Sequence, residues 1–182
     1  MARGIIIFGS AGSGKTTLGR MVAEQLSFPY FDIDDYIWRK DTPEPFTVMY
    51  SRAEKSGRLM ADISQYEYFV MAGSMSSFHE GFDPLFDLAV HLSCDTDVRI
   101  ERVNKRAVEQ FGNRVLESGD LYKRHQKFLD NVARYDKDGS PNLAEHLRWV
   151  KSMACPVLQL DGEMQLAENC ARIVNKYLNL MR

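Results

Sequence analysis

The sequence has few cysteines and little net charge. Its 182 residues include three cysteines, Cys94, Cys155 and Cys170, which are far apart and lack CxxC or Cys/His ligand spacing. We therefore expect neither a disulfide framework nor a zinc site, only buried thiols. The formal net charge is -2, from 23 basic and 25 acidic residues, which gives no general attraction to nucleic acid or to an anionic membrane. A small-molecule partner is expected.

Long apolar runs are also missing. No uninterrupted run approaches the roughly 20 residues that cross a bilayer, and the apolar start of the chain is too short for a signal peptide. We therefore expect a cytoplasmic protein, either a monomer or a homodimer. Neither repeats nor low-complexity segments interrupt the sequence, and 45% of its residues are hydrophobic. This composition predicts one compact domain over residues 1–182.

A short β-branched run predicts a strand at 4–8, and further short apolar runs predict strands at 28–33, 68–72, 88–92 and 157–160. Apolar residues with helical spacing follow the first run from Lys15 onward, and a closing helix is predicted over 163–180. Buried strands that alternate with helices form a parallel sheet between two helical layers. The pattern therefore predicts an α/β fold, a three-layer sandwich around a parallel five-stranded sheet.

Two connections are longer than a crossover requires, and we expect them to carry function. We assign residues 35–66 to a substrate-binding insertion and residues 106–155 to a lid and helical insertion. Residues 99–134 contain nine Lys or Arg against five Asp or Glu, a basic excess typical of a lid that closes over phosphates. An ordinary solvated helix with the same charges is the alternative.

The strongest motif is a glycine-rich loop between the first predicted strand and helix. Residues 9–16 read Gly-Ser-Ala-Gly-Ser-Gly-Lys-Thr and match G-x-x-x-x-G-K-[ST]. Such a loop turns successive amides toward phosphate groups, and the following helix points its positive end at them. The alternative is a flexible glycine turn whose lysine faces water. The predicted nucleotide-binding residues here are Gly9, Ser10, Ala11, Gly12, Ser13, Gly14, Lys15, Thr16 and Thr17.

Together with this loop, the rest of the sequence resembles the adenylate kinase and shikimate kinase branch of P-loop kinases over nearly its whole length. Three further stretches carry the resemblance: 31–35, 101–106 and 157–162. It implies strand order 2-3-1-4-5, a helical lid, and ATP with Mg²⁺ as cofactors. An AAA-type ATPase is compatible with the same loop.

The stretch 31–35 contains the Asp-x-Asp of shikimate and gluconate kinases, matched here by Asp32 and Asp34. The resemblance implies that Asp34 orients the acceptor hydroxyl, as a general base, and that Asp32 supports a metal ion held by Thr16. The alternative is structural. Asp34 or Asp35 would then cap a helix that begins near Tyr36.

The stretches 101–106 and 157–162 resemble the nucleotide side of these kinases. Arg102 matches the arginine that lies against the adenine, and Arg106 the one that reaches the phosphates. Asp161 and Gly162 fall in the loop that wraps the adenine. For the catalytic lid arginine we predict Arg106 and Arg114 first, then Arg124.

The acceptor-binding residues are the part of the predicted site that the sequence motifs define least. Trp38, Arg39 and Arg52 lie in the first insertion and are predicted to bind the acceptor, although aromatic residues near loops more often belong to a core. Gly73 and Ser74 end the third predicted strand, where ligands of open α/β sheets collect. That strand ends without a carboxylate, and with one glycine where shikimate kinases have three.

The predicted function is ATP-dependent transfer of the γ-phosphoryl group to a small molecule, either a nucleoside, a nucleotide or a shikimate-like hydroxyl compound. The alternative is an ATP-binding switch or ATPase that regulates a protein partner. Turnover stimulated by an acceptor separates the two. The histidines, His79, His91, His125 and His146, are scattered, and no chemistry is assigned to them.

Overall fold

The computed structural model describes residues 2–42, 47–75 and 77–182, and at its centre is a five-stranded sheet. The strand order is β2-β3-β1-β4-β5, and each neighbouring pair is parallel. The predicted α/β architecture and strand order are confirmed. The strands are β1 (Arg3–Gly9), β2 (Tyr30–Asp32), β3 (Tyr68–Ala72), β4 (Phe86–Ser93) and β5 (Val157–Asp161).

Strand β2 is shorter than the predicted run 28–33. Its start is delayed because the helix before it closes through Ser27, whose φ is 56°, and the Phe28 N–H donates to Ala23 O at 2.9 Å. Phe28 therefore belongs to the turn that ends the helix. The chain becomes a strand only at Tyr30.

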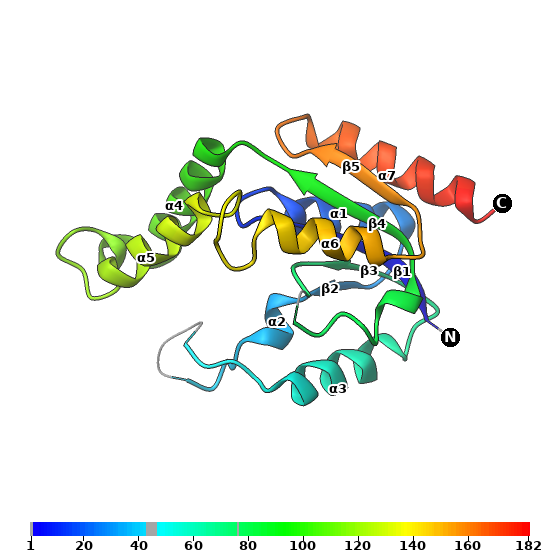
Figure 1. Ribbon diagram of the computed structural model, residues 1–182, viewed down its shortest axis with the longest axis horizontal. Helices are drawn as coiled ribbons and strands as arrows, with labels where there is room; N and C mark the ends of the chain where they lie inside the picture. The colour runs from blue at the N-terminus through cyan, green and yellow to red at the C-terminus, as the bar shows by residue number, and fades with distance from the viewer. Residues whose placement is uncertain (1, 43–46, 76) are drawn as a thin grey trace.

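Helices cover both faces of the sheet (Figure 1). Helices α1 (Lys15–Leu26) and α7 (Leu166–Leu180) cover one face, and α3 (Arg52–Ile63) and α6 (Leu143–Ser152) cover the other. Because side chains alternate along a strand, Ile5 and Ile7 of β1 join the first core, while Ile6 and Phe8 join the second. All four side chains are fully buried. This burial on both faces accounts for the continuous apolar run.

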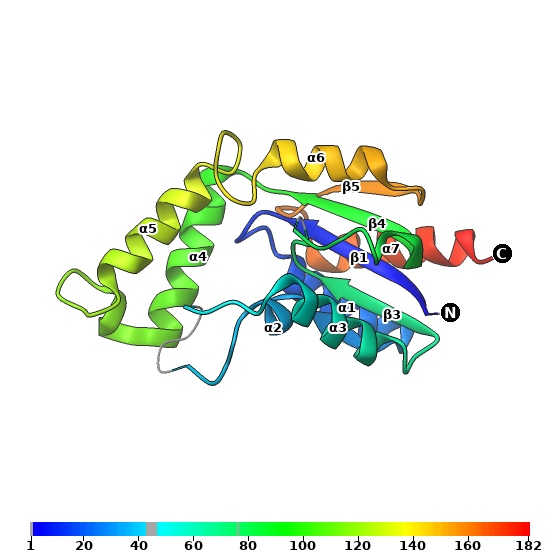
Figure 2. The same cartoon turned by 60° about the horizontal axis from the view of Figure 1, so that its bottom comes forward.

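Two segments extend past the carboxyl edge of the sheet. Helices α4 (Thr96–Phe111) and α5 (Tyr122–Ala133), joined through the short helix η2 (Gly112–Val115), project beyond the end of β4. Figure 2 shows the segment after α2 (Asp34–Ile37) extending on the same side. A short helix η1 (Asp83–Leu85) precedes β4.

Each predicted insertion contains one helix that belongs to the core. In the stretch 35–66, α3 begins at a capping box formed by Ser51 and Glu54 and buries Leu59 and Ile63 against the sheet. In the stretch 106–155, α6 does the same with Trp149. Residues 43–46 of the first insertion lie outside the described residues. Among the described helices, none has both the length and the apolar character that crossing a bilayer requires.

Candidate active site

The glycine-rich loop has the backbone shape of a phosphate cradle. Gly12 has a φ of 81°, and a Cβ atom there would lie 2.5 Å from the carbonyl oxygen of Arg99. The Ser13 N–H donates to Ser10 O at 3.3 Å, which turns the loop back on itself before α1 begins at Lys15. The first amides of α1 have no partner inside the helix, so they remain available to an anion.

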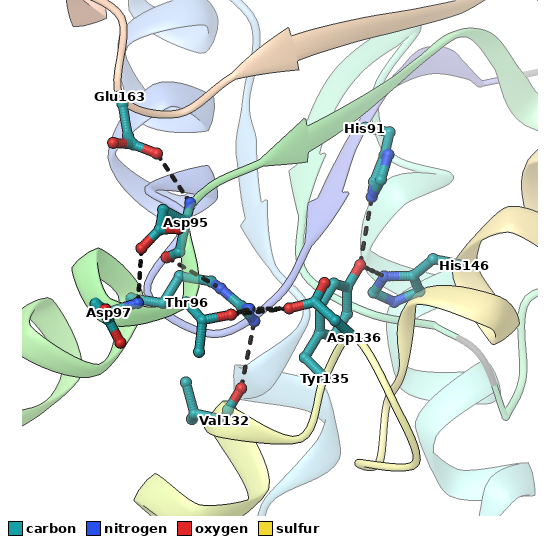
Figure 3. Close-up of polar contacts among 10 residues, drawn as sticks. His91, Asp95, Thr96, Asp97, Val132, Tyr135, Asp136, His146 and Glu163 are labelled. Atoms are coloured by element: carbon teal, nitrogen blue, oxygen red, sulfur yellow. Dashed lines mark hydrogen bonds and ion pairs between the residues drawn. The ribbon is translucent and has the colours of Figure 1, made fainter.

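Arg99 of α4 fixes the base of the projecting helices against this loop. Its side chain is fully buried, and its guanidinium contacts Asp136 at 2.5 Å and Thr96 at 2.5 Å (Figure 3). A further bond reaches Val132 O at 3.3 Å. Because the same residue's backbone packs on Gly12, α4, the segment after α5 and the cradle are held as one unit.

Lys15 lies between the cradle and two carboxylates. Its Nζ donates to Ser10 O at 3.1 Å. Burial lowers the pKa of Lys15, and Arg106 adds to this, while Asp34 and Asp32 act in the opposite direction. The ammonium group is therefore within electrostatic reach of both members of the predicted Asp-x-Asp pair.

The Asp-x-Asp pair spans the end of β2 and the start of α2. The Asp34 N–H donates to Asp32 Oδ1 at 3.2 Å, and the Tyr30 hydroxyl donates to Asp32 Oδ2 at 3.2 Å. Although the Asp34 side chain is open to solvent, desolvation raises its pKa, with Lys15 acting against that shift. Ile33, not Asp34, is the N-cap of α2, and Asp35 pairs with Lys40 at 2.8 Å.

Thr16 and Asp32 both lie near the phenol of Tyr30. The Tyr30 hydroxyl donates to Asp32 Oδ2 at 3.2 Å, and burial and Asp32 raise the pKa of Tyr30 while Thr16 lowers it. In the part of the chain that the structure describes, no three His, Cys, Asp or Glu side chains form a metal cage. A hydroxyl and a carboxylate beside a phosphate cradle nevertheless fit Mg²⁺, because this ion takes most of its ligands from substrate phosphates and water. Thr16 and Asp32 are therefore the residues that could hold a nucleotide-bound metal.

The predicted adenine-side residues are brought to the cradle. Arg102 donates through one Nη1 atom to Gly12 O at 3.4 Å and to Gly162 O at 3.1 Å. A Cβ atom on Gly162 would lie 2.3 Å from Ser13 O, so the loop after β5 touches the cradle directly. Asp161 is exposed, and its Oδ1 accepts the N–H of Glu163 at 2.9 Å.

The lid arginines have different surroundings. Burial has the largest effect on the pKa values of Lys15 and Asp34, and the charge of Arg106 on α4 lowers both, so this exposed arginine lies within electrostatic reach of the two residues. Arg114 of η2 is exposed and paired with Asp120, with an N–O distance of 2.7 Å. Arg124 is half-buried on α5. The structure thus places Arg106 within electrostatic reach of Lys15 and Asp34, whereas Arg114 is paired with Asp120.

The predicted substrate residues of the first insertion are joined to Met49, Asp41 and Glu80. Trp38 forms an antiparallel bridge with Met49. Arg39 pairs with Asp41 at 2.6 Å. Arg52 pairs with Glu80 at 2.5 Å, which ties the start of α3 to the segment after β3.

Gly73 and Ser74 lie next to the Asp-x-Asp pair. Gly73 has a φ of 139°, and a Cβ atom there would lie 2.6 Å from the Cβ of Ile33, the residue before Asp34. The Ser74 Oγ lies 2.9 Å from His146 Nε2. The ends of β2 and β3 therefore form one continuous wall beside Lys15.

Histidines contribute to the site in a way that sequence reasoning missed. His146 Nδ1 lies 2.8 Å from Tyr135 Oη, which also lies 3.3 Å from His91 Nε2 (Figure 3). No spacing signal links these residues, because they come from β4, α6 and the segment after α5. Their meeting is a product of the tertiary fold.

Replacing Gly12 with alanine is expected to destabilise the protein by about 2 kcal/mol and to weaken nucleotide binding at least tenfold. The cause is a Cβ atom 2.5 Å from Arg99 O at a positive φ. Gly57→Ala is the matched control, because its Cβ atom meets nothing within 4 Å on helix α3; it should stabilise by about 1 kcal/mol. Urea unfolding and nucleotide titration measure both. If Gly12→Ala and Gly57→Ala changed stability and nucleotide affinity equally, the assignment of Gly12 to a phosphate cradle would be contradicted.

Comparisons with known proteins agree with this geometry. A family model described as an AAA domain matches residues 5–119, well over half of the chain. The protein YqaC of Bacillus subtilis, which is uncharacterised, is 29% identical over 96% of this chain and 97% of its own. A shikimate kinase of Staphylococcus aureus is 25% identical over 86% of this chain and 92% of its own.

A solved structure has the same fold. The shikimate kinase of Bacteroides thetaiotaomicron superposes with a TM-score of 0.50 at 16% sequence identity, covering 97% of this chain and 98% of that one. At this identity the likeness concerns the fold alone. Together with the matched family model, these findings show that the chain belongs to the AAA domain family, in the branch of P-loop small-molecule kinases that contains shikimate and adenylate kinase-like proteins.

Proposed function

We propose that this protein transfers the γ-phosphoryl group of Mg²⁺-ATP to a hydroxyl group of a small molecule. The observation that carries the proposal is the geometry of the phosphate cradle, in which Gly12 has a φ of 81° and Lys15 Nζ lies 3.1 Å from Ser10 O. Asp34 and Arg106 lie within electrostatic reach of Lys15. A phosphoryl transfer needs opposite charges around the moving group and a carboxylate at the attacking hydroxyl. Lys15, Asp34 and Arg106 supply both.

On the nucleotide side, the backbone amides of residues 9–17 would hold the phosphates and Lys15 would neutralise their oxygens. Thr16 and Asp32 would hold Mg²⁺, which supplies positive charge at the phosphate oxygens when bound. Arg102 would lie against the adenine, with Asp161 and Gly162 forming the loop around it.

On the acceptor side, Asp34 would orient the hydroxyl and take its proton. The bond between the acceptor oxygen and the γ-phosphorus forms as the bond from the γ-phosphorus to the bridging oxygen of ADP breaks. Arg106 would stabilise the negative charge that is redistributed over the γ-phosphoryl oxygens. Arg114 and Arg124 are further candidates for stabilising this charge, if the lid moves toward the phosphates.

The rest of the acceptor site would come from the residues 35–66 and from the wall at the end of β3. Trp38, Arg39 and Arg52 belong to the former, and Gly73 and Ser74 to the latter. A nucleoside, a nucleotide or a shikimate-like hydroxyl compound fits a site with hydroxyl, guanidinium and aromatic groups. Residues 106–155 would supply the lid, and the protein would act in the cytoplasm as a monomer or homodimer.

The test is ADP formation from Mg²⁺-ATP with a panel of nucleosides, nucleoside monophosphates, shikimate and sugar acids, with the Lys15→Ala protein as the blank. We expect one compound to stimulate ADP formation at least tenfold over the rate without acceptor, with equimolar phosphorylated product. Slow ADP formation that is indifferent to every compound would contradict the kinase proposal. It would favour an ATPase or a nucleotide-dependent switch instead.

A further inference from the structure

Three buried side chains, His91, Tyr135 and His146, are linked to Ser74 at the end of β3. These four residues, here called the polar cluster, are joined by hydrogen bonds of 2.9, 2.8 and 3.3 Å. His146 is fully buried, and Tyr135 is 6% exposed. The ring of Phe8, the residue before the cradle, lies 5.2 Å from that of His91 and 5.3 Å from that of His146. The polar cluster therefore adjoins the site.

Every member of the polar cluster is neutral at neutral pH. Burial, with His91 and Lys15 adding to it, lowers the pKa of His146 to about 3. Burial also lowers the pKa of His91 and raises that of Tyr135. Each histidine ring then carries one proton, and so does the phenol. If the Tyr135 hydroxyl donates to one histidine, it accepts from the other, and this fixes the direction of every hydrogen bond in the polar cluster.

Distances and charge set that direction. The Tyr135 Oη is 2.8 Å from His146 Nδ1 but 3.3 Å from His91 Nε2, so the phenol proton belongs in the shorter contact. The guanidinium carbon of Arg99 lies 5.0 Å from the centre of the Tyr135 ring, and a positive charge there makes the phenol a stronger donor. Figure 3 shows Tyr135 between the two imidazoles.

The remaining protons follow. Because His146 Nδ1 accepts from Tyr135, the ring proton of His146 is on Nε2, which lies 2.9 Å from Ser74 Oγ. Ser74 Oγ accepts this hydrogen bond, so the Ser74 O–H is left to donate to a group other than His146. Ser74 is half-buried, and the Gly73 N–H before it donates to Ile7 O at 3.0 Å, which holds the residue at the carboxyl edge of the sheet.

We infer that His146 is a positioning residue that makes the Ser74 hydroxyl a hydrogen-bond donor toward the phosphoryl acceptor. The inference rests on the proposed function, in which Ser74 lines the acceptor site. It also narrows the acceptor: the group that faces Ser74 offers a lone pair, as a carboxylate or hydroxyl oxygen does and an ammonium group does not. If these hydrogen bonds ran in the opposite direction, Ser74 would donate to His146 and would prefer an acceptor group that donates a hydrogen bond.

The direction of the chain can be measured without any acceptor. Long-range ¹H–¹⁵N spectra of the uniformly ¹⁵N-labelled full-length protein at pH 7 report which ring nitrogen of each histidine carries the proton, and the His146 signals are those lost in His146→Gln. We expect the proton on Nε2 of His146 in the wild type, and a mixture of tautomers in Tyr135→Phe. A proton on Nδ1 in the wild type overturns the inference, whatever the protein catalyses.

The consequence for the acceptor is measured with the compound that the panel identifies. Ser74→Ala should raise the acceptor KM about tenfold and Tyr135→Phe about threefold, with the KM for ATP unchanged. In the Ser74→Ala background, Tyr135→Phe should add nothing, because its effect passes through Ser74. Tyr66→Phe, an exposed tyrosine between α3 and β3, is the control. Additive effects of Ser74→Ala and Tyr135→Phe would show a merely structural role and contradict the inference.

Discussion

Replacing Lys15 with methionine is expected to reduce acceptor-dependent ADP formation by roughly 10³-fold. The ammonium group is the positive charge nearest to the cradle, held 3.1 Å from Ser10 O and facing Asp32 and Asp34. Methionine keeps most of the apolar stem and removes the charge, so the loss reports on electrostatics rather than on packing. Initial rates at saturating Mg²⁺-ATP and acceptor measure it.

Two comparisons make the Lys15 result interpretable. Lys176→Met removes an exposed lysine from α7 and should leave the rate within twofold. Lys15→Arg restores a charge of different shape and should recover only part of the activity. A Lys15→Met protein that folds normally and retains a tenth of the wild-type rate would contradict the assignment of Lys15 to the phosphates.

Replacing Asp34 with asparagine is expected to lower kcat by about 10²- to 10³-fold while the KM for ATP changes little. Asp34 is the first residue of α2, and its carboxylate lies within electrostatic reach of Lys15. Asparagine keeps the shape but cannot accept the proton of an attacking hydroxyl. Steady-state kinetics with the identified acceptor give kcat and the two KM values separately.

The pH profile gives a second readout for Asp34. Desolvation raises its pKa, so the carboxylate protonates at a higher pH than an ordinary aspartate, whose pKa is about 4. Activity of the wild type should therefore fall on the acid side beginning above that value, and this acid limb should be absent from Asp34→Asn.

Asp35→Asn is the matched control for this charge. Asp35 is the exposed neighbour that pairs with Lys40, and its replacement should leave both kcat and the acid limb within threefold of the wild type. Similar losses in Asp34→Asn and Asp35→Asn would show that local charge, not a specific carboxylate, is responsible. That outcome would contradict the role of Asp34.

Much of the fold could be predicted because its determinants are local. The strand at Tyr68–Ala72 appears with the predicted bounds, and β1 lies within one residue of its prediction, since a short apolar run buried on both faces is a strong signal. The cradle was equally readable, because glycines, a lysine and a threonine at fixed offsets leave few other structures. The start of β2 was predicted two residues early, since the reversal at Ser27 belongs to the end of α1.

The site was predictable where a sequence motif marks its residues. Arg106 and Arg114 were both predicted as the catalytic arginine, yet Arg106 acts electrostatically on Lys15 and Asp34 while Arg114 pairs with Asp120. His146, Tyr135 and Ser74 showed no pattern at all, because hydrogen bonds across 11 and 72 residues depend on how α6 packs on the sheet.

The sequence by itself thus determined the parallel sheet, the phosphate cradle and the Asp-x-Asp pair, because backbone conformation, strand burial and helix termini depend on neighbouring residues. Only the tertiary structure decided which arginine meets Lys15, how Arg99 joins α4 to Gly12, and that four separate segments build the polar cluster. The physical reason is that such contacts arise from the packing of whole elements, and each element's local sequence carries no information about its partner's position.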